Sequence, residues 1–271
     1  MNAHIDDGTI DRATYGPWAV IAGGSEGVGA ELADRLGAQG IDLILVARKP
    51  GPLQATADRI ARAHGVQVRT LSGDLLDPDV VRRVRDLAAE ADVGTFIYNA
   101  GANTYGAEFV EGDLPSFQQV IDLNITRQLE LTQHFGARLK KRGKGALVLV
   151  GSMSGYVGHV DISVYAAAKA FERIFAEGLW AELRPHGVHV LHAVLGLTRT
   201  PAMERIGLRM DLPGVHVADP GDIAEEMLAR LGDGPVQVLG GNAEQALNHC
   251  GPDRARLVTE VAVGIRRMSP R

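Results

Sequence analysis

The chain has 271 residues, of which 45% are apolar and 23% charged, the balance of a globular protein with a sizeable core. The formal net charge of −5 leaves no global basic field to neutralise phosphates, which argues against a nucleic-acid partner. Cys250 is the only cysteine, which excludes an internal disulfide and a zinc cluster built on thiolates, and we expect no bound metal.

Short apolar, β-branched runs alternate with longer segments of helical period. Strands are expected at 18–22, 41–47, 66–71, 95–99, 146–150, 188–194 and 235–240. Helices are expected at 28–36, 53–61, 77–91, 116–139, 164–183, 220–231 and 255–267. The strands read as fully buried rather than half-exposed and crossover helices separate them, so a mostly parallel sheet covered on both faces is expected. The pattern predicts an α/β fold, and the absence of repeats or linkers favours one domain over 1–271.

A glycine-rich turn follows the first strand. The stretch "VIAGGSEGVGAELADRLG" (20–37) places Gly23, Gly27 and Gly29 between that strand and the first helix. Glycine is needed where a side chain would block a pyrophosphate or where φ must be positive, and the helix N-terminus then faces the phosphates. We therefore predict a dinucleotide-binding turn here, with an ordinary glycine-rich turn as the alternative.

The spacing G-x-x-x-G-x-G in this turn resembles that of the short-chain dehydrogenase/reductases. Four later stretches resemble that family in matching order: "GDL" (73–75), "NAG" (99–101), "GS" (151–152) and Tyr165-x-x-x-Lys169. Ser152 lies thirteen residues before Tyr165, the interval that the family has. The segment "LGLTRTP" (195–201) is similar to its Pro-Gly-x-x-x-Thr segment, although Leu195 replaces the proline.

The likeness covers about residues 16–240, so the first fifteen residues and a C-terminal extension (241–271) with a last helix lie outside it. It implies a doubly wound Rossmann fold, with a mostly parallel seven-stranded sheet and helices on both faces. It also implies a homodimer or homotetramer, for which we expect contacts through helices 116–139 and 164–183.

Tyr165 and Lys169 lie one turn apart on the same face of a predicted helix. A phenol with a pKa near 10 is a poor base at neutral pH, and a neighbouring ammonium favours its phenolate. Ser152, at the end of a strand, could hydrogen-bond a carbonyl oxygen that gains negative charge. The resemblance implies these roles, with Lys169 also anchoring a ribose, and assigns Asn124 ("DLNITRQ") to a water in the proton path.

Alternatives remain for several of these side chains. Tyr165 and Lys169 could form a surface pair, and Asn124 could tie neighbouring backbone. Ser154 offers a competing hydroxyl, and His159 could contact a substrate or pack in its loop.

The resemblance also implies the residues that contact a nicotinamide dinucleotide. They are Gly23, Ser25, Gly27, Val28, Gly29, Arg48, Asp74, Leu75, Asn99, Ala100, Gly101, Tyr165, Lys169, Gly196, Thr198 and Thr200. An acid at the end of the second strand would bind the ribose hydroxyl of NAD, but Ala47, Arg48 and Lys49 stand there. Two cations favour the 2′-phosphate of NADP, and NAD stays possible; Glu26 in the glycine turn argues the other way.

These motifs predict an NAD(P)-dependent oxidoreductase that interconverts a carbonyl and a secondary alcohol by hydride transfer, with Tyr165 as general acid/base. The segment 201–219 would cover the site, and its apolar residues fit a hydrophobic alcohol or ketone unless they pack on the body or on a partner subunit. A non-redox epimerase or dehydratase and a non-catalytic dinucleotide sensor remain as alternatives.

The expected location is the cytoplasm, without a membrane partner. No apolar run approaches the eighteen or so residues that cross a bilayer. The polar, acidic N-terminus is unlike the charged and then apolar pattern of a signal peptide.

Overall fold

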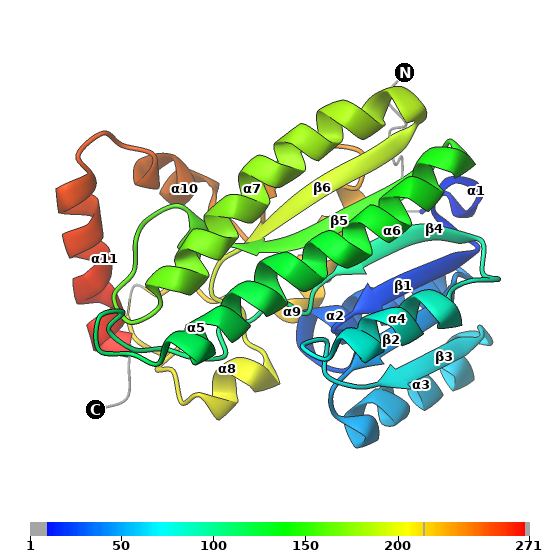
Figure 1. Cartoon of the computed structure of the whole chain (residues 1–271), viewed down its shortest axis with the longest axis horizontal. Coiled ribbons are helices and arrows are strands. Elements are labelled where there is room, and N and C mark those ends of the chain that lie inside the picture. The colour runs from blue at the N-terminus through cyan, green and yellow to red at the C-terminus, as the bar shows by residue number, and fades with distance from the viewer. Residues whose placement is uncertain (1–9, 214, 269–271) are drawn as a thin grey trace.

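A computed structural model describes residues 10–213 and 215–268 of the chain (Figure 1). Seven strands form one parallel sheet in the order β3-β2-β1-β4-β5-β6-β7. Their bounds are β1 Trp18–Ala22, β2 Asp42–Ala47, β3 Val68–Ser72, β4 Val93–Tyr98, β5 Gly145–Ser152, β6 Val188–Leu195 and β7 Val236–Val238. The predicted seven-stranded, doubly wound sheet is confirmed. Residues 1–9, which carry much of the signal-peptide argument, lie outside the described residues.

The helices cover both faces of the sheet, with α4, α6 and α7 on one face and α2, α3 and α9 on the other (Figure 1). Their bounds are α1 Arg12–Tyr15, α2 Gly27–Ala38, α3 Pro50–His64, α4 Pro78–Leu87, α5 Leu114–Ile121, α6 Arg127–Arg142, α7 Ser163–Leu183, α8 Pro201–Arg205, α9 Pro220–Ala229, α10 Ala243–His249 and α11 Arg254–Met268. Each face has its own apolar core, built around Leu36 and Ile223 on one side and Phe135 and Val190 on the other. Because both faces are buried, central strands such as β1 and β5 are almost entirely apolar, whereas the edge strand β3 is partly exposed and carries Arg69, Thr70 and Ser72.

Local chemistry sets the helix boundaries that position these layers. Asp77 caps α4 by accepting a hydrogen bond from the Asp79 amide at 2.9 Å, and proline follows as the first helical residue. Gly65 ends α3 with φ of +70°, a left-handed conformation that glycine adopts without steric cost. These signals make the predicted helices agree with the observed ones to within a few residues.

The predicted helix 116–139 forms as an unbroken run of helical turns, but it is not a regular α-helix throughout. It begins as α5, widens into a π-helical turn at Asp122–Thr126 and continues as α6. Asn124 lies inside this turn and donates from Nδ2 to the carbonyl oxygens of Val120, at 2.8 Å, and Ala102, at 2.9 Å. A side chain that binds backbone of its own helix and of a neighbouring loop favours such a local widening, which often marks a functional position.

Three short helices, α1, α8 and α10, were not predicted because none has enough residues to show a hydrophobic period. The C-terminal helices α10 and α11 lie beyond the end of the sheet (Figure 1), and Arg254 of α11 donates to the Tyr156 carbonyl at 2.7 Å. Within the described residues, no helix combines the length and the apolar character that crossing a bilayer requires.

Candidate active site

A cleft of about 2020 Å³ lies at the carboxyl ends of the strands, where the strand order reverses between β1 and β4. Open α/β sheets bind ligands at such a switch point. Almost all predicted site residues line this cleft: Gly23, Ser25, Gly27, Val28, Arg48, Asp74, Leu75, Asn99, Ala100, Gly101, Ser152, Tyr165, Lys169, Gly196, Thr198 and Thr200. Gly29 and Asn124 are buried behind its wall.

The glycine turn favours glycine for two reasons: two of its residues have a positive φ, and a third has no room for a Cβ. Gly23 and Gly27 have φ of +90° and +56°. A Cβ on Gly29 would lie 1.9 Å from the Gly23 carbonyl oxygen, so the first turn of α2 could not approach β1 with any side chain there. Asn99, at the end of β4, donates to that carbonyl at 2.9 Å. The turn is thus a cradle of bare backbone at a helix N-terminus.

Ser152 is the last residue of β5, and its Oγ accepts a hydrogen bond from the Ser154 amide at 3.1 Å. The hydroxyl hydrogen therefore stays available for an acceptor in the cleft. The turn 153–155 packs on α7, where a Cβ on Gly155 would lie 2.8 Å from the Lys169 carbonyl carbon. Ser154 lines the same cleft, so it remains a competing hydroxyl.

The Lys169 ammonium is buried at the base of the cleft, with Nζ 5.6 Å from the centre of the Tyr165 ring. Because Lys169 is only 2% exposed, the two residues do not form a surface pair. Nζ donates to the Val150 carbonyl at 3.1 Å and to both carboxylate oxygens of Glu172, at 2.8 and 3.0 Å. Glu172 is fully buried, and its Oε1 also accepts from Nε2 of Gln128 at 3.0 Å.

The Lys169–Glu172 pair was missed in the sequence, although a signal was present. Glu172 falls three residues after Lys169 on the face of α7 that buries Ala168 and Ala176, and a charge on a buried face needs a partner. Burial by itself lowers the pKa of Lys169, but the charge and hydrogen bond of Glu172, with the Tyr165 oxygen, leave it raised.

Burial raises the pKa of Glu172, against the opposing effect of Lys169, so the two groups compete for one proton. Both oxygens of Glu172 face Nζ, and one also accepts from an amide. Because an ionised carboxylate accepts at all of these contacts, we take the pair as ionised.

Asn124 Oδ1 is buried without a hydrogen-bond partner in the described part of the chain. A Cβ built on Gly101 would lie 2.8 Å from this oxygen and 2.6 Å from Lys169 Nζ, so Gly101 packs closely against both side chains and they lie near each other. An unpartnered buried amide oxygen beside an ammonium suits a polar ligand or a water. The backbone role weighed for Asn124 is also present, through Nδ2.

Glu26, in the glycine turn, forms an ion pair with Arg205 of α8, whose NH1 donates to Oε2 at 3.0 Å. The hydrogen bond from Arg205 holds the pKa of Glu26 below its usual value, and the charges of Lys49 and Arg48 act in the same direction. The start of the covering segment is therefore attached to the glycine turn. This contact joins residues 179 positions apart, and no local pattern predicts it.

Two C-terminal segments bring apolar side chains to the cleft, which together form an apolar wall, and they also contribute the charged residues Arg205, Arg209, Glu260, Arg266 and Arg267. The apolar side chains are Met203, Ile206, Leu208 and Leu212 of the covering segment, and Leu257, Val261, Ile265 and Met268 of α11. The Arg209 amide donates to the Met268 carbonyl at 3.0 Å, which ties the two segments together. Met210, by contrast, is buried away from the cleft.

The histidines divide between the cleft and the core. His159 lines the cleft, and its burial, with a smaller effect of His249, lowers its pKa to about 4. His192 is buried under the strand end, where a Cβ on Gly151 would lie 2.3 Å from its ring. His189 accepts from or donates to the Tyr15 hydroxyl at 2.7 Å, as a packing histidine does.

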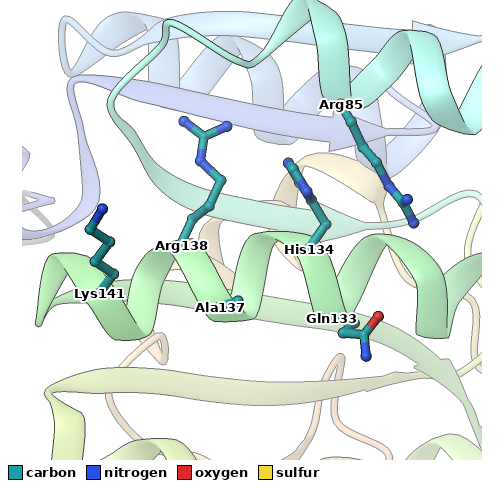
Figure 2. Close-up of a pocket in the computed structure, with 6 residues that line it drawn as sticks. All are labelled: Arg85, Gln133, His134, Ala137, Arg138 and Lys141. Atoms are coloured by element: carbon teal, nitrogen blue, oxygen red, sulfur yellow. The ribbon is translucent and has the colours of Figure 1, made fainter.

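A second hollow, of about 580 Å³, lies between α4 and α6 (Figure 2). It is lined by Arg85, Gln133, His134, Ala137, Arg138 and Lys141. Arg138 is bound to the Ala88 and Ala91 carbonyls and Arg85 to the Glu130 carbonyl, so these cations tie the two helices together. The hollow contains no predicted site residue. Within the described residues, no group of three or more His, Cys, Asp or Glu could hold a metal ion.

Comparison with known proteins identifies the family and agrees with the fold. The family model for short chain dehydrogenases matches residues 17–210, and the chain belongs to that family of oxidoreductases, which bind nicotinamide dinucleotides.

Among curated relatives, a 7beta-hydroxysteroid dehydrogenase of Clostridium sardiniense is 31% identical over 70% of this chain and 72% of its own length. A very-long-chain 3-oxoacyl-CoA reductase of Neurospora crassa is 32% identical over 76% of this chain, which spans 64% of that reductase. A solved short-chain dehydrogenase from Sphingobium yanoikuyae in complex with NADPH is 30% identical, with a TM-score of 0.77 over 90% of this chain and 96% of that one.

Proposed function

We propose that this chain interconverts a carbonyl and a secondary alcohol on a hydrophobic small molecule, with a preference for NADP. The observation that carries the proposal is that Ser152, Tyr165 and Lys169 line one cleft with the glycine turn. A hydroxyl donor, a phenol and a buried ammonium in one cleft are what proton transfer to a carbonyl oxygen requires.

The glycine cradle fits a dinucleotide, because any Cβ at Gly29 would overlap backbone and because Gly27 and Val28, at the start of α2, line the cleft. Gly23, Ser25, Gly27 and Val28 would contact the pyrophosphate, and the other predicted contacts follow the strand ends across the cleft. They are Asp74 and Leu75 near an adenine, Asn99, Ala100 and Gly101 after β4, and Gly196, Thr198 and Thr200 after β6. A bound nicotinamide supplies or accepts the hydride.

The end of β2 supports the NADP preference. Arg48 lines the cleft beside Lys49, and no acid stands at this point. Glu26, which would repel a phosphate, is neutralised by Arg205. A 2′-phosphate therefore meets an excess of positive charge, and the guanidinium of Arg48 can contact it with two donors.

The mechanism assigns one task to each polar group. Ser152 donates its free hydroxyl hydrogen to the substrate oxygen and orients it. Tyr165 gives its proton to that oxygen in reduction and takes it back in oxidation. Lys169 stabilises the phenolate electrostatically and anchors a ribose. Asn124 holds a water in its unpartnered space beside Lys169, through which the proton returns to solvent.

The substrate is proposed from the apolar wall. Two segments, 201–212 and α11, turn aliphatic and thioether side chains toward the cleft, and such side chains accommodate bulky apolar ligands. Two relatives are named for a hydroxysteroid and a very-long-chain 3-oxoacyl-CoA, and the steroid of the first and the acyl chain of the second are bulky and apolar. We therefore infer a bulky hydrophobic ketone or alcohol.

We further propose a cytoplasmic homodimer or homotetramer that uses the outer surfaces of the long helices. Phe171 and Ile174 of α7 are 39% and 61% exposed, and Leu114 at the start of α5 is 66% exposed. Large apolar side chains on neighbouring helices favour a subunit contact. Sedimentation of the full chain tests this, and a monomer at micromolar concentration would contradict it.

A panel of bulky ketones and alcohols, followed by absorbance of the reduced nicotinamide, tests the proposed reaction. Tyr165→Phe should lower kcat by about a hundredfold or more, because it removes the proton donor and leaves the ring in place. A Tyr15→Phe variant, which changes a tyrosine far from the cleft, is the control. Near-normal carbonyl reduction by Tyr165→Phe would refute the mechanism.

A further inference from the structure

Glu172 is a buried carboxylate that the proposed mechanism does not use. Its neighbours on the buried face of α7 are small or apolar, including Ala168, Ala176 and Leu183. A buried ion pair contributes little more stability than well-packed apolar residues of the same volume. A role other than stability is therefore to be sought in the contacts of Glu172.

The contacts of Glu172 fix the position of the Lys169 ammonium. The two carboxylate oxygens and the Val150 carbonyl accept from Nζ within 3.1 Å. Gln128, on α6, donates to Oε1 of Glu172 at 3.0 Å and so fixes the carboxylate from the opposite side. Hydrogen bonds thus connect Gln128 of α6 to Glu172, and Glu172 to the Lys169 ammonium beside the Tyr165 ring.

Other titratable groups also face this pair. Tyr165 lies on the same helix as Lys169. The charge of Glu172 also acts to raise the pKa of Tyr98 on β4, after the larger effect of burial. His192 of β6 and Arg173 of α7 lie on the other side, and burial, with Lys169 and Arg173, lowers the pKa of His192 to about 3. Among the described residues, Glu172 is the one carboxylate in contact with Lys169.

We propose that Glu172 is a positioning residue for proton transfer at Tyr165: it keeps Lys169 in its cationic form beside the phenol, and Gln128 holds Glu172 in place. The role in proton transfer rests on the proposed function, whereas the effect on the charge of Lys169 is a property of the chain alone.

The direction of the effect follows from burial. Without the carboxylate, an ammonium that is completely enclosed loses its proton at a much lower pH. A neutral Lys169 no longer stabilises the phenolate of Tyr165, so the phenol should ionise at higher pH. If Glu172 instead only weakened the field of Lys169, its removal would move the ionisation of the phenol to lower pH.

Glu172→Gln is the decisive variant, because it keeps the shape of the side chain and removes its charge. The ultraviolet absorbance of tyrosinate is titrated in the cofactor-free chain, and subtraction of the same titration with Tyr165→Phe isolates this phenol. We expect the midpoint of Tyr165 ionisation to move upward by about one to three pH units. The control is Glu182→Gln, the same change at an exposed position of α7, which should leave the midpoint unchanged.

An unchanged or lowered midpoint in Glu172→Gln would overturn the proposal. Should that variant fail to fold, Gln128→Leu provides the second test, because it keeps both charges and removes the amide that fixes the carboxylate. It should raise the midpoint in the same direction by a smaller amount, and no change would again overturn the proposal.

The pH profile of alcohol oxidation separates this proposal from the proposed function. In Glu172→Gln the pH at which kcat rises should move upward by the same amount as the tyrosinate midpoint. A shifted midpoint in a chain that oxidises or reduces none of the panel would refute the oxidoreductase function and leave the charge-holding role intact. Normal turnover with an unmoved profile would refute the role of Glu172 alone.

Discussion

Two ion pairs border the cleft and differ in their exposure to water. The side chains of Lys169 and Glu172 are 1% and 0% exposed, whereas those of Arg205 and Glu26 are 46% and 29% exposed. A sealed pair is costly to break because each partner would stay buried and uncompensated, but an exposed pair can exchange its contact for water. The comparison indicates a fixed charge on α7 and a reversible contact between α8 and the glycine turn.

The largest effect is expected when the buried pair loses one partner. Glu172→Ala should lower the free energy of unfolding by about 3–5 kcal/mol, because Lys169 stays buried without a counterion. The double variant Lys169→Met/Glu172→Leu should lose far less, since it replaces the pair by apolar side chains of similar volume. Urea unfolding measures both, and equal losses would contradict the assignment of a charge effect.

A pH effect is expected from His192, which lies behind the buried pair. Its pKa is about 3 in the folded chain and near 6.5 when unfolded, because burial, and then Lys169 and Arg173, disfavour the charged ring. The unfolded chain therefore binds a proton that the folded chain does not. This stability is fully present above pH 6.5 and is lost as the pH falls from 6.5 toward 3.

His192→Leu should remove this dependence. Between pH 7 and pH 5 the unfolding free energy of the unmodified chain should fall relative to that of the variant by on the order of 1–2 kcal/mol. Urea midpoints at the two pH values measure the difference. Parallel losses in both chains would show that His192 is not buried in its neutral form.

On the exposed side, Arg48→Ala should weaken NADPH binding about tenfold and leave NADH binding unchanged, since only NADPH carries the 2′-phosphate. Fluorescence titration with each dinucleotide measures both affinities. The control is Arg59→Ala, which removes an arginine paired with Asp34 on α3 and α2, outside the cleft. Tighter binding of NADH than of NADPH by the unmodified chain would overturn the NADP preference.

The smallest effect is expected from Arg205→Ala. Its loss should leave the unfolding free energy unchanged within error, because the pair is half-exposed. It should weaken NADPH binding by a factor of about two to five, since it exposes the Glu26 charge to the phosphates, and high salt should abolish the difference. A large loss of stability would show that the covering segment is held as firmly as the catalytic helix.

Much of the fold could be predicted from the chain itself. Apolar runs such as 146–150 and the periodic face of 164–183 report burial directly, because side chains alternate or recur with the geometry of their own element. The glycine turn was readable because positive φ and the overlap at Gly29 demand one residue type. The π-helical turn at Asp122–Thr126 could not be predicted, since it depends on a hydrogen bond from Asn124 to a distant loop.

The candidate site divides in the same way. Sequence spacing by itself determined which residues, Ser152, Tyr165 and Lys169, are carried to the edge of the sheet, because strand ends and helical turns are local properties. Only the tertiary structure decided that Glu172 and Gln128 enclose Lys169 and that Arg205 reaches Glu26. Such contacts join separate elements, and burial sets the strength of their charges, so packing of the whole chain determines both.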